Sequence, residues 1–419
     1  MLVWNVLILL SYLEGDKMVS LFDGRSGAYY PSYMLMKIDS SINFENFEEN
    51  RDEQKGTFMH EYCHFIQDVS TTYGYITYIY NLQELLIKLH LIDIRDDNAV
   101  QQNRDYYTFF RGYDSVKDNL VFINKISIQE DSDYKAEYGE TDWEYVKVTY
   151  NGNKEFVFGG ACIAESMAYL SEKRLYEVQV RENEFPYNIC QLICEKEYPE
   201  IADDMIVLAL CEFALLEQNS GVFFVKLLRK MKRDKFLTKD VRVLEKYVSE
   251  NYTIGFRGRK QKIEDILGCL YPGEITEFKD IREWVISRFE LGCELREQSN
   301  IFLSLCLFPE DAHIRYGCIQ TVMNVLEFPI MLDNQNFFYS GAYKGGEDIE
   351  ARYLLGPFVL YEMLDEDGKL TVKECPLLEM CSSMDGYHGC KYTHGSETLI
   401  CDENCMLNLF CKLYGIAFG

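Results

Sequence analysis

Residues 56–74, GTFMHEYCHFIQDVSTTYG, contain three side chains whose types and spacing can do chemistry: His60, Glu61 and His64. On a helix, residues four positions apart lie on one face, one turn from each other. Two imidazoles in that relation can both bind one Zn²⁺ ion at about 2.0–2.1 Å. Glu61 projects beside the same face, where its carboxylate can take a proton from a zinc-bound water instead of binding the metal. The spacing therefore predicts a zinc site on a helix.

The residues around this motif favour the helix. Met59, Cys63, Ile66 and Val69 recur every three to four positions, and no Pro or Gly intervenes before Gly74. The alternative is that the two histidines are ordinary helix residues, because three fixed positions arise by chance. The chain has only six histidines, so two of them in this frame around a Glu favour zinc.

A catalytic zinc site needs a third protein ligand, and residues 156–177 offer one. This stretch, FVFGGACIAESMAYLSEKRLYE, has a helical pattern that begins at Gly159 and Gly160. Glu165 lies in its first two turns among small and apolar residues, where a carboxylate is costly to bury unless it is paired or bound to metal. The alternative is that Glu165 only favours the positive end of the helix dipole.

Four other acidic residues are possible third ligands: Asp68, Glu155, Glu172 and Glu177. Asp68 is one turn past the second histidine and suits a supporting role, whereas Glu155 falls in an expected hairpin, where its side chain faces solvent. Glu172, two turns beyond Glu165 on the same face, is the main rival. The two glycines at the start of the helix let that end approach another backbone closely, which favours Glu165.

H-E-x-x-H followed by a helix with E-x-x-A, here Glu165-Ser-Met-Ala168, resembles the gluzincin branch of the zincin metallopeptidases. The resemblance covers two short segments. It implies that His60, His64 and Glu165 bind the zinc ion and that Glu61 is the general base. It also implies a small sheet ahead of the first zinc helix. Glu165 follows His64 by 101 positions, a longer interval than in compact members of that branch.

The implied activity is that of a zinc-dependent metallopeptidase that hydrolyses peptide bonds with a Glu-activated, zinc-bound water. Such a site also needs a donor for the tetrahedral oxyanion, and His313, Arg315 and Tyr316 are candidates. Two other classes stay open. One is a non-catalytic zincin-like binding or scaffold protein, and the other is a helical regulatory protein whose C-terminal cysteines form its only metal site.

The composition bounds the partners of the protein. A chain of 419 residues that is 47% hydrophobic and 14% aromatic can bury a sizeable core. Its formal charge of −26 repels phosphate backbones and anionic membrane surfaces. We therefore expect a protein or peptide substrate, no nucleic acid and no membrane partner.

The cysteines indicate a reducing compartment. Fifteen of them are spread through a large chain, and several look like small core residues: Cys190, Cys194, Cys211, Cys306 and Cys318. The N-terminal LVWNVLILLSYL lacks a basic flank and a cleavage site and is too short to span a bilayer, so it is interpreted as a buried strand. A cytoplasmic location follows as the prediction.

The last 50 residues differ from the rest of the chain. Cysteines crowd together there with His388 and His394, and four such ligands can close a structural zinc site; the cysteines are Cys375, Cys381, Cys390, Cys401, Cys405 and Cys411. No clean C-x₂-C pair is present, so reduced cysteines without metal are the alternative.

The expected fold class is α+β, mainly α, with a zincin-like core, a small N-terminal sheet and a helical C-terminal part. A second helical pattern after the motif runs through His90, which is interpreted as a core residue. Asn151–Gly152 between two alternating runs predicts a hairpin turn. The expected parts are the sheet and motif helix in 1–92, a polar insertion in 93–155, a helical part with Glu165 in 156–330, and a Cys-rich region in 331–419.

Overall fold

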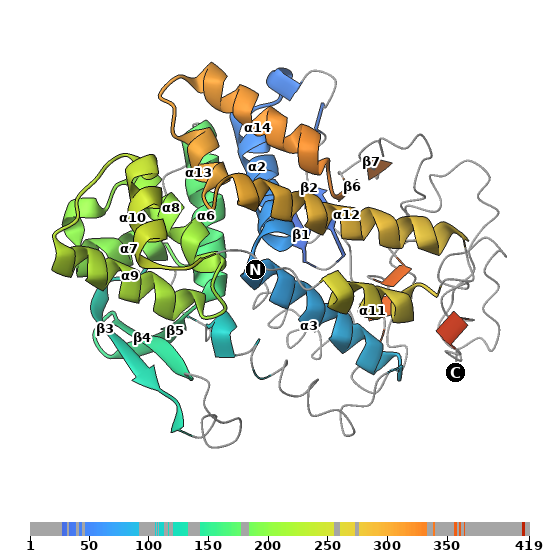
Figure 1. Cartoon of the computed structure of the whole chain (residues 1–419), viewed down its shortest axis with the longest axis horizontal. Coiled ribbons are helices and arrows are strands. Elements are labelled where there is room, and N and C mark those ends of the chain that lie inside the picture. Colours follow the sequence, from blue (N-terminus) through green and yellow to red (C-terminus); the bar gives the residue numbers. More distant parts are fainter. Residues whose placement is uncertain are drawn as a thin grey trace.

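The computed structural model describes the chain from Gly27 onward, with gaps, and only a few residues after Leu332 (Figure 1). The described ranges are 27–38 without 32, 42–43, 47–91, parts of 105–132, 143–176, 184–254, 260–272, 276–332, 338–339, and single residues or pairs within 356–364 and 413–414. The expected strand in LVWNVLILLSYL and the cysteine–histidine cluster of the last 50 residues lie outside these ranges.

The described part is mainly helical with two small sheets, which agrees with the expected α+β, mainly α class. Among the described residues, no helix is both long enough and apolar enough to cross a membrane. The buried apolar side chains form one continuous core that reaches from the first strands to the last helices.

The first sheet joins strands from the two ends of the described chain. β1 (Gly27–Tyr30) and β2 (Leu35–Ile38) are antiparallel, β2 pairs in parallel with β6 (Ile330–Leu332), and β6 pairs antiparallel with β7 (Phe338–Tyr339). The order is β1-β2-β6-β7. The two early strands precede the motif helix as expected. The two late strands are too short for an alternating pattern to reveal them in the sequence.

The motif lies on α2 (Asp52–Ser70), which leads directly into α3 (Thr72–Lys88); a short 3₁₀ turn, η1 (Phe47–Glu49), precedes it. Thr71 separates the two helices with an extended backbone, and its hydroxyl accepts the N–H of Gly74 at 3.0 Å. Most of α2 is buried, including His60, and His64 is partly exposed.

The prediction that His90 is a core residue is wrong, because His90 is exposed. α3 ends two residues before it, and His90 has a left-handed backbone with φ 54°. Its N–H donates to Ile87 O, and the N–H of Leu91 donates to Leu86 O, a pairing that closes helix C-termini. The chain therefore turns outward at His90, although its neighbours in the sequence are apolar.

The strands of the second sheet come from the part of the sequence between α3 and the helix of Glu165. β3 (Ile123–Glu130), β4 (Glu144–Tyr150) and β5 (Lys154–Phe158) form an antiparallel sheet in that order. The predicted turn at Asn151–Gly152 is confirmed: both residues have positive φ, 42° and 93°, as the tight hairpin turn requires. The third strand leads straight into the next helix.

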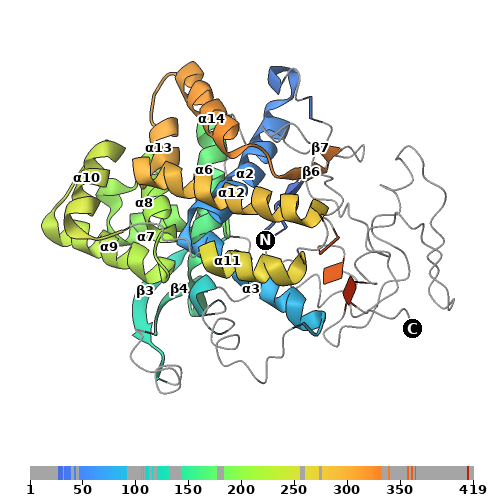
Figure 2. The same ribbon diagram turned by 45° about the vertical axis from the view of Figure 1, so that its right-hand side comes forward.

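Helices follow one another from residue 160 to residue 326. They are α6 (Gly160–Leu175), α7 (Ile189–Glu197), the short η3 (Pro199–Ile201), α8 (Asp204–Leu215), α9 (Ser220–Asp234), α10 (Val241–Asn251), α11 (Lys260–Leu270), α12 (Thr276–Gln298), α13 (Phe302–Leu307) and α14 (Ala312–Leu326). Figures 1 and 2 show α6 between α2 and α8, and α12 crossing α2.

α12 passes very close to the end of α2. At Gly292 an added Cβ atom would lie 2.0 Å from the carbonyl oxygen of Val69. One turn later, Arg296 donates from Nε to the carbonyl of Ser70 at 3.0 Å and from Nη1 to Glu212 Oε1 at 2.7 Å. Glu212 lies on α8, a helix that is buried on all sides, and it also accepts the backbone N–H of Ser304. We call these four residues, Arg296, Glu212, Ser70 and Ser304, the Arg296 cluster.

The cysteines of the described part are all free thiols. Cys190, Cys194 and Cys211 are buried, as the sequence predicted. Cys306 and Cys318 are only partly buried, because they lie on α13 and α14 at the edge of the core.

Candidate metal centre

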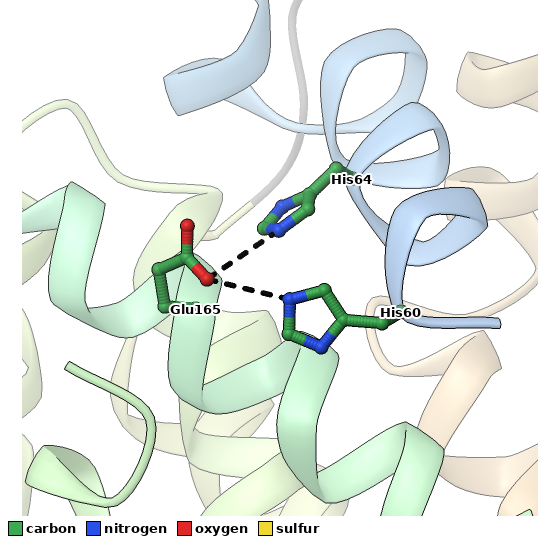
Figure 3. A group of neighbouring side chains, drawn as sticks. All are labelled: His60, His64 and Glu165. Atoms are coloured by element: carbon green, nitrogen blue, oxygen red, sulfur yellow. Dashed lines mark ion pairs between the residues drawn. The ribbon is translucent and has the colours of Figure 1, made fainter. Parts of the chain in front are cut away.

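The packing of α6 against α2 brings His60, His64 and Glu165 together, and we call these three residues the ligand cluster. Figure 3 shows the carboxylate of Glu165 pointing from α6 toward both imidazoles of α2. Its Oε2 atom lies 3.4 Å from His60 Nε2 and 3.6 Å from His64 Nε2. The three ligand atoms lie within 4.8 Å of one another. This buried group can hold a metal ion.

Glycines at the start of α6 allow the close approach that the sequence predicted. A Cβ atom on Gly159 would lie 2.6 Å from the backbone oxygen of Arg111 and the backbone nitrogen of Gly112. A Cβ atom on Gly160 would lie 2.3 Å from the ring of Tyr73 on α3. Larger residues at these two positions would clash with the backbone of residues 111–112 and with Tyr73, and would displace the first turns of α6 together with Glu165.

Glu172, the rival third ligand, meets His60 from the opposite side of the ring. Its Oε2 atom lies 3.1 Å from His60 Nδ1, whereas Glu165 faces His60 Nε2. Of these two acids, Glu165 is therefore the one that lies near the Nε2 atoms of both histidines. A carboxylate on the outer nitrogen of a ligating imidazole fixes the orientation of the ring and raises its basicity. The geometry suits Glu165 to the position of a ligand and Glu172 to that of a supporting residue.

His64 has a different support. Its Nδ1 atom lies 2.9 Å from Gln67 Oε1, and Gln67 Nε2 donates to the carbonyl of Ala164 at 2.9 Å. Gln67 therefore joins the ring of His64 to the residue of α6 that precedes Glu165. Sequence reasoning missed this residue. The signal was present, since Gln67 lies three positions after His64 on the same helix face.

Glu61 is buried beside the cluster with an exposed fraction of 3%. Within the described part of the chain, Glu61 Oε2 and His64 Nε2 are buried and make no hydrogen bond. Strand β1 passes against Glu61, because a Cβ atom on Gly27 would lie 3.0 Å from its Cγ. Buried polar atoms of native proteins nearly always have partners, and a bound cation next to these side chains would account for both.

The electrostatics of the cluster favour a positive charge. Burial lowers the pKa of His60, but hydrogen bonds to Glu165 and Glu172 outweigh burial and raise this pKa to about 10. Burial raises the pKa of Glu61, and the charges of the two other carboxylates raise it further, against the effect of His60 and His64. Burial also opposes ionisation of Glu165, yet the charge of His64 and the close contacts with both imidazoles hold its pKa well below the usual range. Three carboxylates around two imidazoles thus attract either protons or a metal ion.

The remaining acidic candidates lie elsewhere. Asp68 accepts the hydroxyl of Tyr29 at 2.9 Å. Glu155, on β5, forms an ion pair of 2.7 Å with Lys147 at the surface, as expected for a hairpin residue. Glu177 lies outside the described residues.

The contacts of the three oxyanion candidates lead away from the ligand cluster. Arg315 donates from Nη1 to the carbonyls of Pro309 and Glu310 at 2.8 Å and 2.6 Å. Tyr316 donates its hydroxyl to the carbonyl of Leu175 at 2.9 Å, at the far end of α6. His313 is exposed.

A different aromatic residue lies next to the cluster. The ring of Tyr187 is 5.8 Å from the ring of His60, centroid to centroid, in an edge-on arrangement. Tyr187 belongs to the turn before α7, and no periodicity or spacing in the sequence points to it.

In comparisons with known proteins, no family model, no curated protein and no solved structure matches this chain. The interpretation of the site therefore depends on its own residues and geometry.

Proposed function

We propose that this protein is a zinc-dependent metallopeptidase. The observation that supports it most is the convergence of ligand atoms of His60, His64 and Glu165 within 4.8 Å of one another, although Glu165 follows His64 by 101 positions in the chain. Glu61 follows the first of these residues directly and is buried beside them. Together they form a set of two imidazoles, one ligating carboxylate and one further carboxylate.

The donor set fits zinc. Two imidazole nitrogens and one carboxylate are the protein ligands of a well-known class of catalytic zinc sites, which leave one position open. Magnesium and calcium prefer sites made of oxygen atoms alone. Glu172 and Gln67 hold the outer nitrogens of the two imidazoles, so both rings are kept in one orientation.

Each side chain then has a role in peptide hydrolysis. Zinc bound by His60, His64 and Glu165 would supply a Lewis acid for the peptide carbonyl and lower the pKa of a water molecule to about 7. Glu61 accepts a proton from the attacking water and passes it to the nitrogen of the leaving amine. The substrate is a peptide or protein, and the net charge of −26 disfavours strongly acidic ones. We also propose a cytoplasmic location, supported by the free thiols of the described cysteines.

Metal analysis combined with a peptide-library assay tests this function. The purified protein should hold about one zinc ion per chain at this site. Glu61→Gln keeps the size of the side chain but cannot take a proton, so it should bind zinc normally and lose about 10²- to 10⁴-fold in cleavage rate. Glu53→Gln, at an exposed position of the same helix, is the matched control and should leave the rate unchanged.

Two results would support other classes of protein. Zinc at this site without cleavage of any peptide would indicate a non-catalytic binding or scaffold protein. Zinc that is lost only when the terminal cysteines are replaced would indicate a regulatory protein. A Glu61→Gln variant that cleaves as fast as the parent would exclude the proposed mechanism.

A further inference from the structure

A cavity of about 60 Å³ adjoins the ligand cluster, with His64 and Glu165 in its wall. The other sides are closed by two tyrosine rings and by small residues at the starts of α3 and α6: Tyr29, Tyr73, Gly74, Ala161 and Ala164. Asp68 adds a carboxylate to the lining. Two of the candidate metal ligands, His64 and Glu165, thus face a space to which no role has been given so far.

The cavity can be reached from solvent. Three of its lining residues, Pro31, His64 and Ala161, are partly exposed, whereas Asp68 and Glu165 are buried. The side chains of the partly exposed residues therefore form its mouth. A group that enters through this mouth comes to lie directly beside the ligand cluster.

We infer that this cavity binds the side chain of a substrate residue next to the cleaved peptide bond and selects side chains that are small and not acidic. The inference rests on the proposed peptidase function. A carbonyl held at the ligand cluster places the neighbouring side chains of the substrate within a few ångströms of it, and this cavity lies beside the cluster at that distance.

The size of the cavity sets the first limit. A water-sized group needs roughly 10–15 Å³ of such space, so a cavity of this volume accepts about four to six non-hydrogen atoms. Alanine, threonine, valine and asparagine side chains fit within that number. Phenylalanine and arginine side chains exceed it. Ala161 and Ala164 keep the space open, and larger side chains at these two positions would fill it.

The charge of the lining sets the second limit. Asp68 is 3% exposed, and its Oδ2 atom accepts the hydroxyl of Tyr29 at 2.9 Å. Glu165 lies in the wall of the same cavity, but the zinc ion that it would bind balances its charge, so the repulsion comes from Asp68. Like charges repel strongly where water is largely excluded. An aspartate side chain is therefore rejected where an asparagine side chain of the same size is accepted.

Paired peptide substrates separate the two limits. Peptides that carry threonine, phenylalanine, asparagine or aspartate at each of the two residues flanking the cleaved bond are compared by kcat/KM. At one of these two positions, threonine should exceed phenylalanine, and asparagine should exceed aspartate, by at least about tenfold each. Equal rates within both pairs at both positions would overturn the inference and leave the peptidase function in place.

Two variants assign these preferences to the cavity. Asp68→Asn should reduce the preference for asparagine over aspartate and keep the preference for threonine over phenylalanine. Ala161→Val should slow cleavage of the threonine peptide and spare a glycine peptide, because it narrows the cavity. Ala312→Val, at the first residue of α14, is the control and should change neither preference. Unchanged preferences in both cavity variants would contradict the inference.

A binding measurement separates failure of the cavity from failure of the proposed function. If no peptide is cleaved, the proposed function fails, and the same peptides are titrated calorimetrically into the zinc-loaded wild-type protein. Tighter binding of the threonine and asparagine peptides supports the cavity. Equal binding of all four peptides, or no binding of any, overturns it.

Discussion

The ligand cluster and the Arg296 cluster both bury charged side chains against α2, but they differ in how completely these side chains are hydrogen-bonded. All three guanidinium nitrogens of Arg296 and both carboxylate oxygens of Glu212 have partners. In the other region, His64 Nε2 and the neighbouring Glu61 Oε2 are buried without a hydrogen bond inside the described part of the chain. The first arrangement is closed, and the second leaves room for a further positive charge.

The difference shows what each cluster contributes. A buried ion pair with every donor and acceptor satisfied connects α12 to the end of α2 and to α8, so its removal affects the fold. The ligand cluster instead has atoms without hydrogen bonds, so it stabilises the fold when a metal ion binds to it. The two regions should therefore respond differently to substitution and to zinc.

The largest effect is expected in the Arg296 cluster. Glu212→Ala leaves the guanidinium of Arg296 buried, with a side-chain exposure of 2%, and without its carboxylate. Loss of one partner of a buried pair lowers the free energy of unfolding by about 3–5 kcal/mol. Urea unfolding measures this loss, and Glu250→Ala at the surface of α10 is the control, with an expected change within about 0.5 kcal/mol. A loss below about 1 kcal/mol in Glu212→Ala would remove the contrast between the regions.

The next effect separates the two clusters by their response to zinc. Free zinc at a hundred times its Kd should raise the free energy of unfolding of the parent by about 2.7 kcal/mol. His60→Ala and His64→Ala should each abolish this increment, and both should empty the zinc site. His313→Ala, which removes an exposed histidine, should keep the increment. Full zinc binding by both cluster variants would rule out these ligands.

A smaller effect distinguishes ligand from support within the site. Glu172→Gln should weaken zinc binding by about 10- to 100-fold, which corresponds to about 1.4–2.7 kcal/mol, because it removes the charge that orients His60. Glu165→Gln should weaken it more, because it removes a ligand. Competition with a chelator of known affinity measures both variants. The opposite order would move the third ligand to Glu172.

The smallest effect concerns the neutral support of His64. Gln67→Met keeps the length of the side chain and removes the bonds to the imidazole and to α6. We expect zinc binding about tenfold weaker, at the lower end of the range for such partners, and a shifted visible spectrum of the cobalt-substituted protein. Gln83→Met, at a buried position of α3, is the matched control. An unchanged spectrum and affinity in Gln67→Met would show that the bond to His64 has no effect on the metal.

The sequence revealed the local part of the site and little of the tertiary part. His60 and His64 can be paired from sequence because a single helix fixes their separation, and Asn151–Gly152 can be read because a turn is local. The argument that selected Glu165, a carboxylate in an apolar helix, applies equally to Glu212, which proves to be paired with Arg296. Only the packing of α6 against α2 distinguishes these two acids.

Other features depended on contacts between distant segments. The position of Glu172 on the outer side of His60 follows from the rotation of α6 about its own axis, which no spacing within that helix defines. Tyr187 reaches the cluster from an irregular turn. The wrong prediction for His90 has a local cause instead, since the apolar pattern continues past the point where the helix ends.

Gly292 has a consequence for engineering the stability of this protein. Replacement of a helix-interior glycine by alanine is a standard way to gain up to about 1 kcal/mol, because alanine has the higher helix propensity. Here the added methyl group would lie 2.0 Å from the carbonyl oxygen of Val69 and would force α12 away from α2. Arg296, one turn further along α12, would move away from Ser70 together with the helix. A thermostabilising design that follows helix propensity alone would thus weaken the protein at this position, so Gly292 belongs among the residues that such a design keeps.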